Sequence, residues 1–353
     1  ADWLPPANRE VALVLDDLLL ADDGPVPWGD EAATHALSGR FGNVFTVNGE
    51  PDWSMIAERN EVVRLWITNV ASTRTFNVSL PGATMKLLGT DVGLYEREEF
   101  VENLVIAPAE RLIVDVRFDA PGAVPLVNAV KAVDHVYGGI VAEVDTLGAV
   151  TVGDNATAPD HTKEFVTLRA NADVTAEVDP HRARLADPPD VELVLTLEVG
   201  DLPFPIGPMM RLESIYAHPI EWSGTMPGMN QASTARQVRW ILKEPGTGDE
   251  NEAIAWRFDQ GDLVKLRLTS DRTALHAMHH PIHIHGQRML VLSTNGRPTA
   301  NMAWKDTVVV PAGGVVDVLV EMSNPGGWML HCHIAEHLET GMRTVFRVDA
   351  GAP

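Results

Sequence analysis

Short runs of alternating apolar and polar residues make up most of this chain, and they limit the folds that it can adopt. The clearest runs cover residues 10–16, 61–68, 111–118, 191–198, 263–269 and 315–321. Successive side chains of a β-strand point to opposite faces of a sheet, so such runs are typical of strands buried on one side. Gly, Pro, Asn and Asp separate the runs, with 28 glycines and 24 prolines in 353 residues. The pattern predicts an all-β chain built from β-sandwiches.

The two halves of the chain contain similar segments. Residues 60–69, NEVVRLWITN, resemble residues 261–270, GDLVKLRLTS. Residues 108–116, PAERLIVDV, resemble residues 311–319, PAGGVVDVL. The separation is about the same in both pairs, as expected for a duplicated domain.

A change in composition places the boundary between these halves. Residues 151–189 are rich in Asp, Ala, Pro and Thr, which is typical of a linker. Within this linker we expect one short strand at residues 164–168, EFVTL. The predicted domains are therefore residues 1–150 and 190–353.

Composition and charge exclude several classes of protein. A hydrophobic fraction of 45% is sufficient for packed cores, and it is not the composition of a disordered chain. The net charge of −22 would repel phosphate backbones, so we expect no nucleic-acid partner. We also expect no membrane span, because no apolar run approaches the necessary length. The single cysteine, Cys332, cannot form a disulfide within the chain and needs another explanation.

Histidines are concentrated in the C-terminal part. The chain has 13, and eight of them fall between His276 and His337. One cluster is residues 279–286, HHPIHIHG. The other is residues 331–337, HCHIAEH, which is followed by Gly-Met at 341–342.

The second cluster can serve two metal sites at once. If it is a strand, His331 and His333 point to one face and Cys332 points to the other. His283 and His285 alternate along another strand in the same way, so they can face the side reached by His331 and His333. The covalent path from the Cys332 sulfur to either neighbouring histidine would then conduct single electrons between the two sites.

The spacing C-x4-H-x4-M indicates the chemistry of the first site. Cys332, His337 and Met342 provide a thiolate, an imidazole and a weak thioether, a set that favours redox-active copper. The second imidazole must come from elsewhere, and His280 is the natural candidate. Zinc is the rival metal because it also binds Cys and His, although methionine is a poor zinc ligand. The remaining alternative is that these side chains have only structural roles, which a lone histidine usually has.

The order H-P-x-H-x-H-G followed by H-C-H-x3-H-x4-M is similar to the C-terminal domain of multicopper oxidases, the laccase-like family. Residues 304–308, WKDTV, agree with this resemblance. The first half resembles the copper-free middle domain of the family at residues 45–51, 89–93 and 106–111. The resemblance covers nearly the whole chain, and it implies two cupredoxin-like Greek-key β-sandwich domains.

The resemblance also implies a role for each candidate ligand. Type 1 copper would be held by His280, Cys332, His337 and Met342. The trinuclear cluster would be held by His283 on type 2 copper and by His285, His331 and His333 on the type 3 pair. In the family a substrate is oxidised one electron at a time at type 1 copper, and electrons pass through the segment containing Cys332, His331 and His333 to the cluster, where dioxygen is reduced to water.

This chain departs from the family in the number of H-x-H pairs. The trinuclear cluster needs four pairs, and only two are present. The others belong to the family's first domain, and residues 2–6, DWLPP, read like the linker that follows it. We therefore expect a missing cupredoxin domain or a partner chain to complete the cluster. Two-domain relatives complete their clusters by forming trimers, which requires H-x-H pairs in both domains. We do not expect this arrangement here, because the first half of the chain has no such pair.

Three functions remain open. The first is a multicopper oxidase that uses dioxygen as acceptor and phenols, other aromatics or low-valent metal ions as donors. The second is a copper-binding electron-transfer module, and the third is a non-catalytic fragment. By resemblance, the protein would act in the periplasm or outside the cell.

Two further features carry open alternatives. Met209, Met210, Met226 and Met229 lie in one proline-rich stretch. They would bind Cu(I) or, as we prefer, fill gaps in the packing. Glu336 and Glu339 flank His337 and would either relay protons and tune the ligand or, as is commoner, be solvated.

Overall fold

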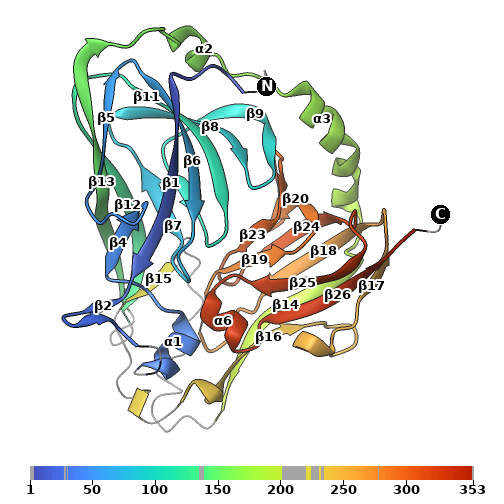
Figure 1. The fold of residues 1–353 in the computed structure, drawn as a ribbon. Helices are drawn as coiled ribbons and strands as arrows, with labels where there is room; N and C mark the ends of the chain where they lie inside the picture. The colour runs from blue at the N-terminus through green and yellow to red at the C-terminus, as the bar shows by residue number, and fades with distance from the viewer. Residues whose placement is uncertain are drawn as a thin grey trace.

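The computed structural model describes residues 4–27, 29, 31–134, 139–200, 220–223, 230–231, 234–276 and 278–351. These residues form two β-sandwiches joined by a helical segment (Figure 1). We call them the N-terminal and the C-terminal sandwich. The all-β prediction is confirmed.

The N-terminal sandwich consists of two sheets around one apolar core. Its first sheet has the order β4 (Val44–Val47), β1 (Arg9–Leu18), β6 (Val62–Asn69), β11 (Arg111–Phe118), β8 (Ala83–Thr90) and β9 (Gly93–Val101). Its second sheet has the order β10 (Leu104–Ile106), β7 (Phe76–Ser79), β12 (Gly122–Asp134), β13 (Ile140–Ala156) and β5 (Trp53–Arg59), with β15 (Ile220–Ser223) paired to β12. A small hairpin joins β2 (Leu20–Ala21) and β3 (Gly24–Pro25).

The C-terminal sandwich has the same construction. One sheet has the order β16 (Val238–Lys243), β14 (Val191–Val199), β18 (Leu263–Ser270), β24 (Val315–Glu321), β20 (Arg288–Thr294) and β21 (Arg297–Pro298), with β22 (Trp304–Lys305) paired to β20. The other has the order β17 (Arg257–Asp259), β26 (Arg343–Asp349), β25 (Gly326–Cys332), β19 (His280–Ile284) and β23 (Thr307–Val310). Short helical turns are α6 (Ala335–Glu339), η2 (Ala235–Gln237) and η3 (Asn251–Ala253).

The segments that repeat in the sequence are equivalent strands. Residues 62–69 form β6 and residues 263–270 form β18, each inside its sheet. Each pairs in parallel with the first strand of its sandwich, β1 or β14, and antiparallel with β11 or β24. Their apolar residues alternate or run continuously because these inner strands are covered on both faces along part of their length.

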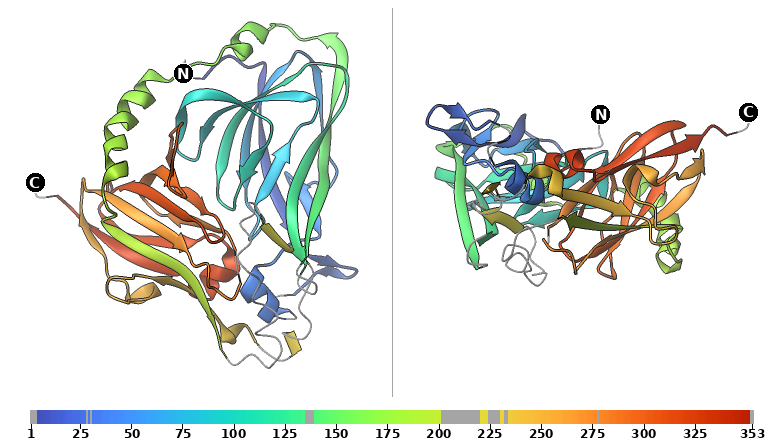
Figure 2. Two further views of the ribbon diagram at one scale, coloured as in Figure 1. Left: turned by 180° about the vertical axis from the view of Figure 1, so that it is seen from behind. Right: turned by 90° about the horizontal axis from the view of Figure 1, so that it is seen from below.

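Helical turns form the connection between the sandwiches. They are α2 (Thr162–Val166), α3 (Ala172–Val178) and η1 (Asp179–Ala186), and they pass along the outside of both sandwiches (Figures 1 and 2). The strand predicted at residues 164–168 is therefore wrong, because residues 162–166 are helical. Only Phe165 is buried there, whereas Val166 and Leu168 are half exposed, so the segment has no alternating apolar face that could join a sheet.

Two buried lysines fasten this connection. Lys86 on β8 lies 3.5 Å from the carbonyl oxygens of Glu164 and Thr167. Lys265 on β18 donates to the carbonyl oxygens of Arg184, Leu185 and Asp187 at 3.1, 3.0 and 2.6 Å. Carbonyls at the end of a helical turn have no partner within the turn, and an ammonium group supplies one. The connection is thus held against both sandwiches.

Some elements pack across the predicted boundaries. Helix α1 (Ala32–Ser38) contributes Ala33, Ala36 and Leu37 to the core of the C-terminal sandwich, while β15 extends an N-terminal sheet. Strand β13 continues to Ala156, beyond the predicted domain end at residue 150. The boundaries themselves stay a prediction. Among the described residues, no helix is both long enough and apolar enough to cross a membrane.

Candidate metal centres

A cysteine and two histidines meet in the interior of the C-terminal sandwich. Cys332 ends β25, His280 begins the neighbouring strand β19, and His337 lies on α6. Strand pairing places Ile282 opposite Cys332, so His280 is brought to the end of the same ladder. The Cys332 Sγ atom lies 3.8 Å from His280 Nδ1 and 3.7 Å from His337 Nδ1. Their ligating atoms all lie within 4.8 Å of one another.

These distances match a common metal ion between the three atoms. A first-row metal lies about 2.3 Å from a thiolate sulfur and about 2.0 Å from an imidazole nitrogen. With ligands about 120° apart, as in a trigonal His₂Cys site, sulfur and nitrogen would be separated by about 3.7 Å. The observed 3.7 and 3.8 Å agree with this value, and the chain therefore has room for copper in this position.

The three side chains are fully buried, and burial decides their protonation. Burial raises the pKa of the Cys332 thiol far above its ordinary value. It lowers the pKa of His280 to about 3 and holds that of His337 well below its usual range. Neutral imidazoles keep their lone pairs for a metal, and a buried thiolate needs a cation to offset its charge. The donor set therefore fits a bound cation.

Met342 lies beside His280, Cys332 and His337, which we call the buried trio. Its side chain is fully buried in the same apolar cluster as Cys332. Its carbonyl oxygen accepts a hydrogen bond from the Cys332 backbone N–H at 3.1 Å, and its own N–H donates to the carbonyl of His337 at 2.9 Å. The turn after α6 thus fixes Met342 relative to both of these ligand candidates.

Trp240 packs against the imidazoles. Its indole stacks on the His337 ring with centroids 3.9 Å apart and meets the His280 ring edge-on at 5.0 Å. Its Nε1–H donates to the carbonyl oxygen of Ala36 on α1 at 2.9 Å. Both rings are therefore oriented by a tryptophan that is itself held by a helix from the N-terminal half of the chain.

Glu336 differs from its expected environment. Of the two alternatives left open, a solvated carboxylate is the commoner, but Glu336 is 3% exposed and accepts a hydrogen bond from Thr73 Oγ1 at 2.8 Å. The same Thr73 oxygen accepts from the backbone N–H of Arg40 at 2.9 Å. Glu336 thus joins α6 to the N-terminal half, whereas Glu339 is exposed.

Four other histidines face one another on adjacent strands. Register pairs His283 on β19 with His331 on β25, and His285 and His333 directly follow the last residues of these two strands. Ring centroids of neighbouring members are 4.9–5.8 Å apart. We call His283, His285, His331 and His333 the four-histidine group.

The nitrogens of this group converge. The Nε2 atoms of His285 and His331 are 3.1 Å apart. Burial and the neighbouring imidazoles lower the pKa of His331 to about 4, so this ring is neutral near pH 7. His331 is buried and His285 is exposed, so the group forms a partly open surface. Converging imidazoles with an open side are suited to bind metal ions that take further ligands from elsewhere.

Comparison with known proteins agrees with this arrangement. Residues 223–352 match the family model described as multicopper oxidase. The matched segment contains His280, Cys332 and His337 as well as the four-histidine group. Laccase-3 of Oryza sativa subsp. japonica is 24% identical over 404 residues, covering 97% of this chain and 69% of that protein. Multicopper oxidase MmcO of Mycobacterium tuberculosis is 25% identical over 333 residues, covering 90% of this chain and 54% of that protein.

Solved structures show the same fold. The multicopper oxidase from Campylobacter jejuni, described as a metallo-oxidase, aligns with a TM-score of 0.67 at 22% identity, covering 97% of this chain and 64% of that one. A laccase-like multicopper oxidase CueO from Ochrobactrum sp. aligns with a TM-score of 0.65 at 21% identity, covering 98% and 68%. The prediction of two cupredoxin-like sandwiches is confirmed, and the chain spans only part of these multicopper oxidases.

The sequence motifs predict most of the centre but not its surroundings. His280, Cys332 and His337 meet as expected, and the four-histidine group gathers on the other face of the Cys332 strand. Their roles as copper ligands stay a prediction. Met209, Met210, Met226 and Met229 lie outside the described residues.

The contributions of Trp240, Thr73 and α1 were missed. Each acts through contacts across the chain, such as the bond from Thr73 to Glu336, which joins residues 263 positions apart. An apolar tryptophan in a strand and a threonine in a loop carry no spacing signal for such a role.

Proposed function

We propose that this chain provides the type 1 copper site and half of the trinuclear cluster of a multicopper oxidase. Copper in these sites would supply one-electron oxidation of a reducing substrate and reduction of dioxygen to water. Type 1 copper would be held by His280, Cys332, His337 and Met342. Within the cluster, His283 would serve type 2 copper, and His285, His331 and His333 would serve the type 3 pair.

The position of Cys332 between two groups of histidines carries this proposal. Its side chain joins His280 and His337 on one side of β25, and its backbone joins His331 and His333, which belong to the four-histidine group. Electrons accepted at the sulfur therefore have a short covalent route to the second group. The alternation of side chains along a strand is sufficient to direct neighbouring residues to opposite faces.

The environments of the two groups assign different tasks to them. The side chains of His280, Cys332 and His337 are shielded from water. A thiolate in this position is protected from reaction with solutes while it passes electrons. The four-histidine group is partly open and offers half of the imidazoles that we expect a trinuclear cluster to need. We therefore propose that histidines of a further cupredoxin domain or a partner chain complete it. An electron-transfer module would need only the buried trio.

The physiological setting of the proposal follows the family resemblance. Dioxygen would be the electron acceptor, and small phenols, other aromatic compounds or low-valent metal ions would be the donors. We place the protein in the periplasm or outside the cell. Fractionation of the native host with an antibody against this chain would test that placement, and a purely cytosolic signal would contradict it.

The type 1 assignment can be tested by colour. Copper-loaded protein should show the intense blue absorption of a copper–thiolate bond, and Cys332→Ser should abolish it while leaving the fold intact. His285→Gln is the matched control, since it removes an imidazole from the other group and should leave the blue band unchanged. A blue band that survives in Cys332→Ser would refute the ligand assignment.

A further inference from the structure

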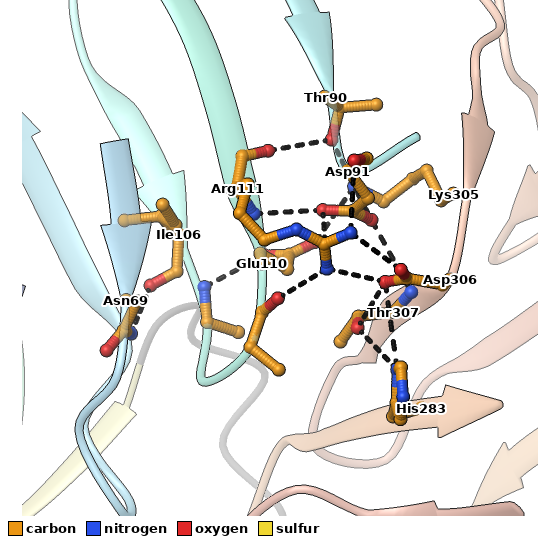
Figure 3. A network of polar contacts seen from close by, with 12 residues as sticks. Asn69, Thr90, Asp91, Ile106, Glu110, Arg111, His283, Lys305, Asp306 and Thr307 are labelled. Atoms are coloured by element: carbon orange, nitrogen blue, oxygen red, sulfur yellow. Dashed lines mark hydrogen bonds and ion pairs between the residues drawn. The ribbon is translucent and has the colours of Figure 1, made fainter. Parts of the chain in front are cut away.

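His283 is attached to a polar network that crosses from one sandwich to the other (Figure 3). Its Nδ1 atom lies 3.0 Å from Thr307 Oγ1 and 3.7 Å from Asp306 Oδ1. Thr307 Oγ1 in turn lies 3.0 Å from Asp306 Oδ1. The register pairs His283 directly with Thr307, so the backbone ladder fixes this contact.

The direction of these hydrogen bonds is determined by Asp306. Arg111 Nη1 and Nη2 donate to its two carboxylate oxygens at 2.7 and 2.6 Å, a two-pronged geometry typical of an ionised carboxylate. An ionised carboxylate only accepts, so the Thr307 hydroxyl must donate its single proton to Asp306. Thr307 can then only accept from His283, which requires the proton of that imidazole on Nδ1.

The N-terminal sandwich holds Arg111 in place. Arg111 begins β11, and its guanidinium also donates to the carbonyl oxygens of Ala109 at 2.8 Å and Asp91 at 3.0 Å. Its backbone N–H donates to Asp91 Oδ1 at 2.9 Å. Each of these donors has an acceptor in the N-terminal sandwich or in Asp306. The N-terminal sandwich therefore holds the guanidinium group of Arg111 in position to bind Asp306.

Lys305 secures the other side of the same contact. Its ammonium group lies 3.0 Å from Asp91 Oδ2, 3.2 Å from Glu110 Oε1 and 2.7 Å from Thr90 Oγ1. These three partners belong to the N-terminal sandwich, whereas Lys305 directly precedes Asp306. Two cations therefore dock the segment that carries Asp306: Arg111 of the N-terminal sandwich binds Asp306, and Lys305 of the C-terminal sandwich binds groups of the N-terminal one.

We propose that Arg111 is a positioning residue for the four-histidine group: through Asp306 and Thr307 it fixes the Nδ1–H tautomer of His283 and leaves Nε2 as the metal-binding nitrogen. This deepens the proposed function, on which its relevance to copper rests. Docking of the N-terminal sandwich thus sets the metal-binding form of an imidazole in the C-terminal one. Metal-ligating histidines generally depend on a partner at the other ring nitrogen in this way.

The tautomer can be observed directly in the metal-free full-length chain. Histidine is labelled with ¹⁵N, and two-bond correlations between ring nitrogens and carbon-bound protons show which nitrogen is protonated; the signal missing in His283→Gln identifies His283. We expect the proton on Nδ1 in the wild type. We expect Arg111→Gln and Thr307→Val to shift His283 toward a mixture of tautomers.

Arg97→Gln is the matched control. Arg97 also bridges the sandwiches, because its Nη1 donates to the carbonyl of Ala300 at 2.9 Å, but within the part of the chain that the structure describes none of its contacts leads to a histidine. The same spectra followed during titration with Zn²⁺ give the affinity at His283. We expect Arg111→Gln to weaken it about 10–100-fold and Arg97→Gln to change it less than about twofold.

Two results would overturn the proposal. One is a wild-type His283 that carries its proton on Nε2. The other is a natively folded Arg111→Gln chain with an unchanged tautomer and unchanged Zn²⁺ affinity; if that variant does not fold, an unchanged tautomer in Thr307→Val has the same meaning. Because no oxidase activity enters these measurements, failure of the proposed function would leave them unaffected.

Discussion

Trp240 offers a sharp test of how the buried trio is held. The side chain is 1% exposed, stacks on His337 and donates to Ala36. Trp240→Phe keeps an aromatic ring but leaves the Ala36 carbonyl without its donor, at a cost of about 1–2 kcal/mol. Trp240→Leu also loses the stacking and opens a cavity, so it should lower the free energy of unfolding by about 3 kcal/mol.

Replacement of Trp240 should also affect copper binding, which replacement of a merely structural tryptophan would not do. Trp240→Leu frees the rings of His337 and His280 to rotate, so the copper affinity of the buried trio should fall as well. Unfolding in urea, with and without copper, measures both quantities, since a ligand that binds only the folded state raises the apparent stability.

Trp256→Leu is the control for this experiment. Trp256 borders the same apolar cluster and packs edge-on against Phe258 with centroids 6.2 Å apart. This variant should lose some stability and keep wild-type copper affinity. Equal losses of copper affinity in the Trp240 and Trp256 variants, or none in either, would refute a positioning role for Trp240.

Three further predictions concern the connection, pH and the axial ligand. Lys265→Met should destabilise the protein by about 2–4 kcal/mol in thermal or urea unfolding, because three carbonyls lose a buried donor. Arg267→Met should cost less, about 1 kcal/mol, because the guanidinium group of Arg267 is partly exposed and Lys265 stays 3.7 Å from the Asp317 carboxylate; equal effects would contradict the fastening role. Burial, aided by Arg40, lowers the pKa of His35 to about 4, so the stability that it contributes is present above about pH 6.5 and is lost as pH falls toward 4. His35→Gln should flatten the decline in melting temperature over that window, and an unchanged slope would contradict the assignment. Met342→Leu should keep the blue site and raise its reduction potential in redox titration, and an unchanged potential would mean that Met342 only packs nearby.

Local patterns in the sequence predicted the strands and the convergence of ligand candidates. Residues 61–68 and 263–269 are predicted as strands from their short alternating runs, and the structure shows β6 and β18 there. The alternation His331–Cys332–His333 predicts two opposite faces for the same geometric reason. Such features depend on neighbours along the chain, so a single sequence is sufficient to find them.

Features that depend on distant partners could not be found in this way. The apolar run at residues 164–168 resembles a strand, but Phe165 is buried there by packing against Lys86 and Phe100. The contact between Arg111 and Asp306 joins residues 195 positions apart. Neither spacing nor composition predicts such pairs, because they follow from how the two sandwiches dock.

Oxygen consumption by the isolated chain tests the central claim most directly. Copper is counted per chain, and a phenolic donor is supplied with and without a cupredoxin domain that carries two H-x-H pairs. We predict that the isolated chain becomes blue and accepts electrons from the donor, yet consumes oxygen slowly or not at all until the domain is added. Full turnover by this chain alone, with no other polypeptide present, would contradict the proposal that the four-histidine group is half of a shared cluster.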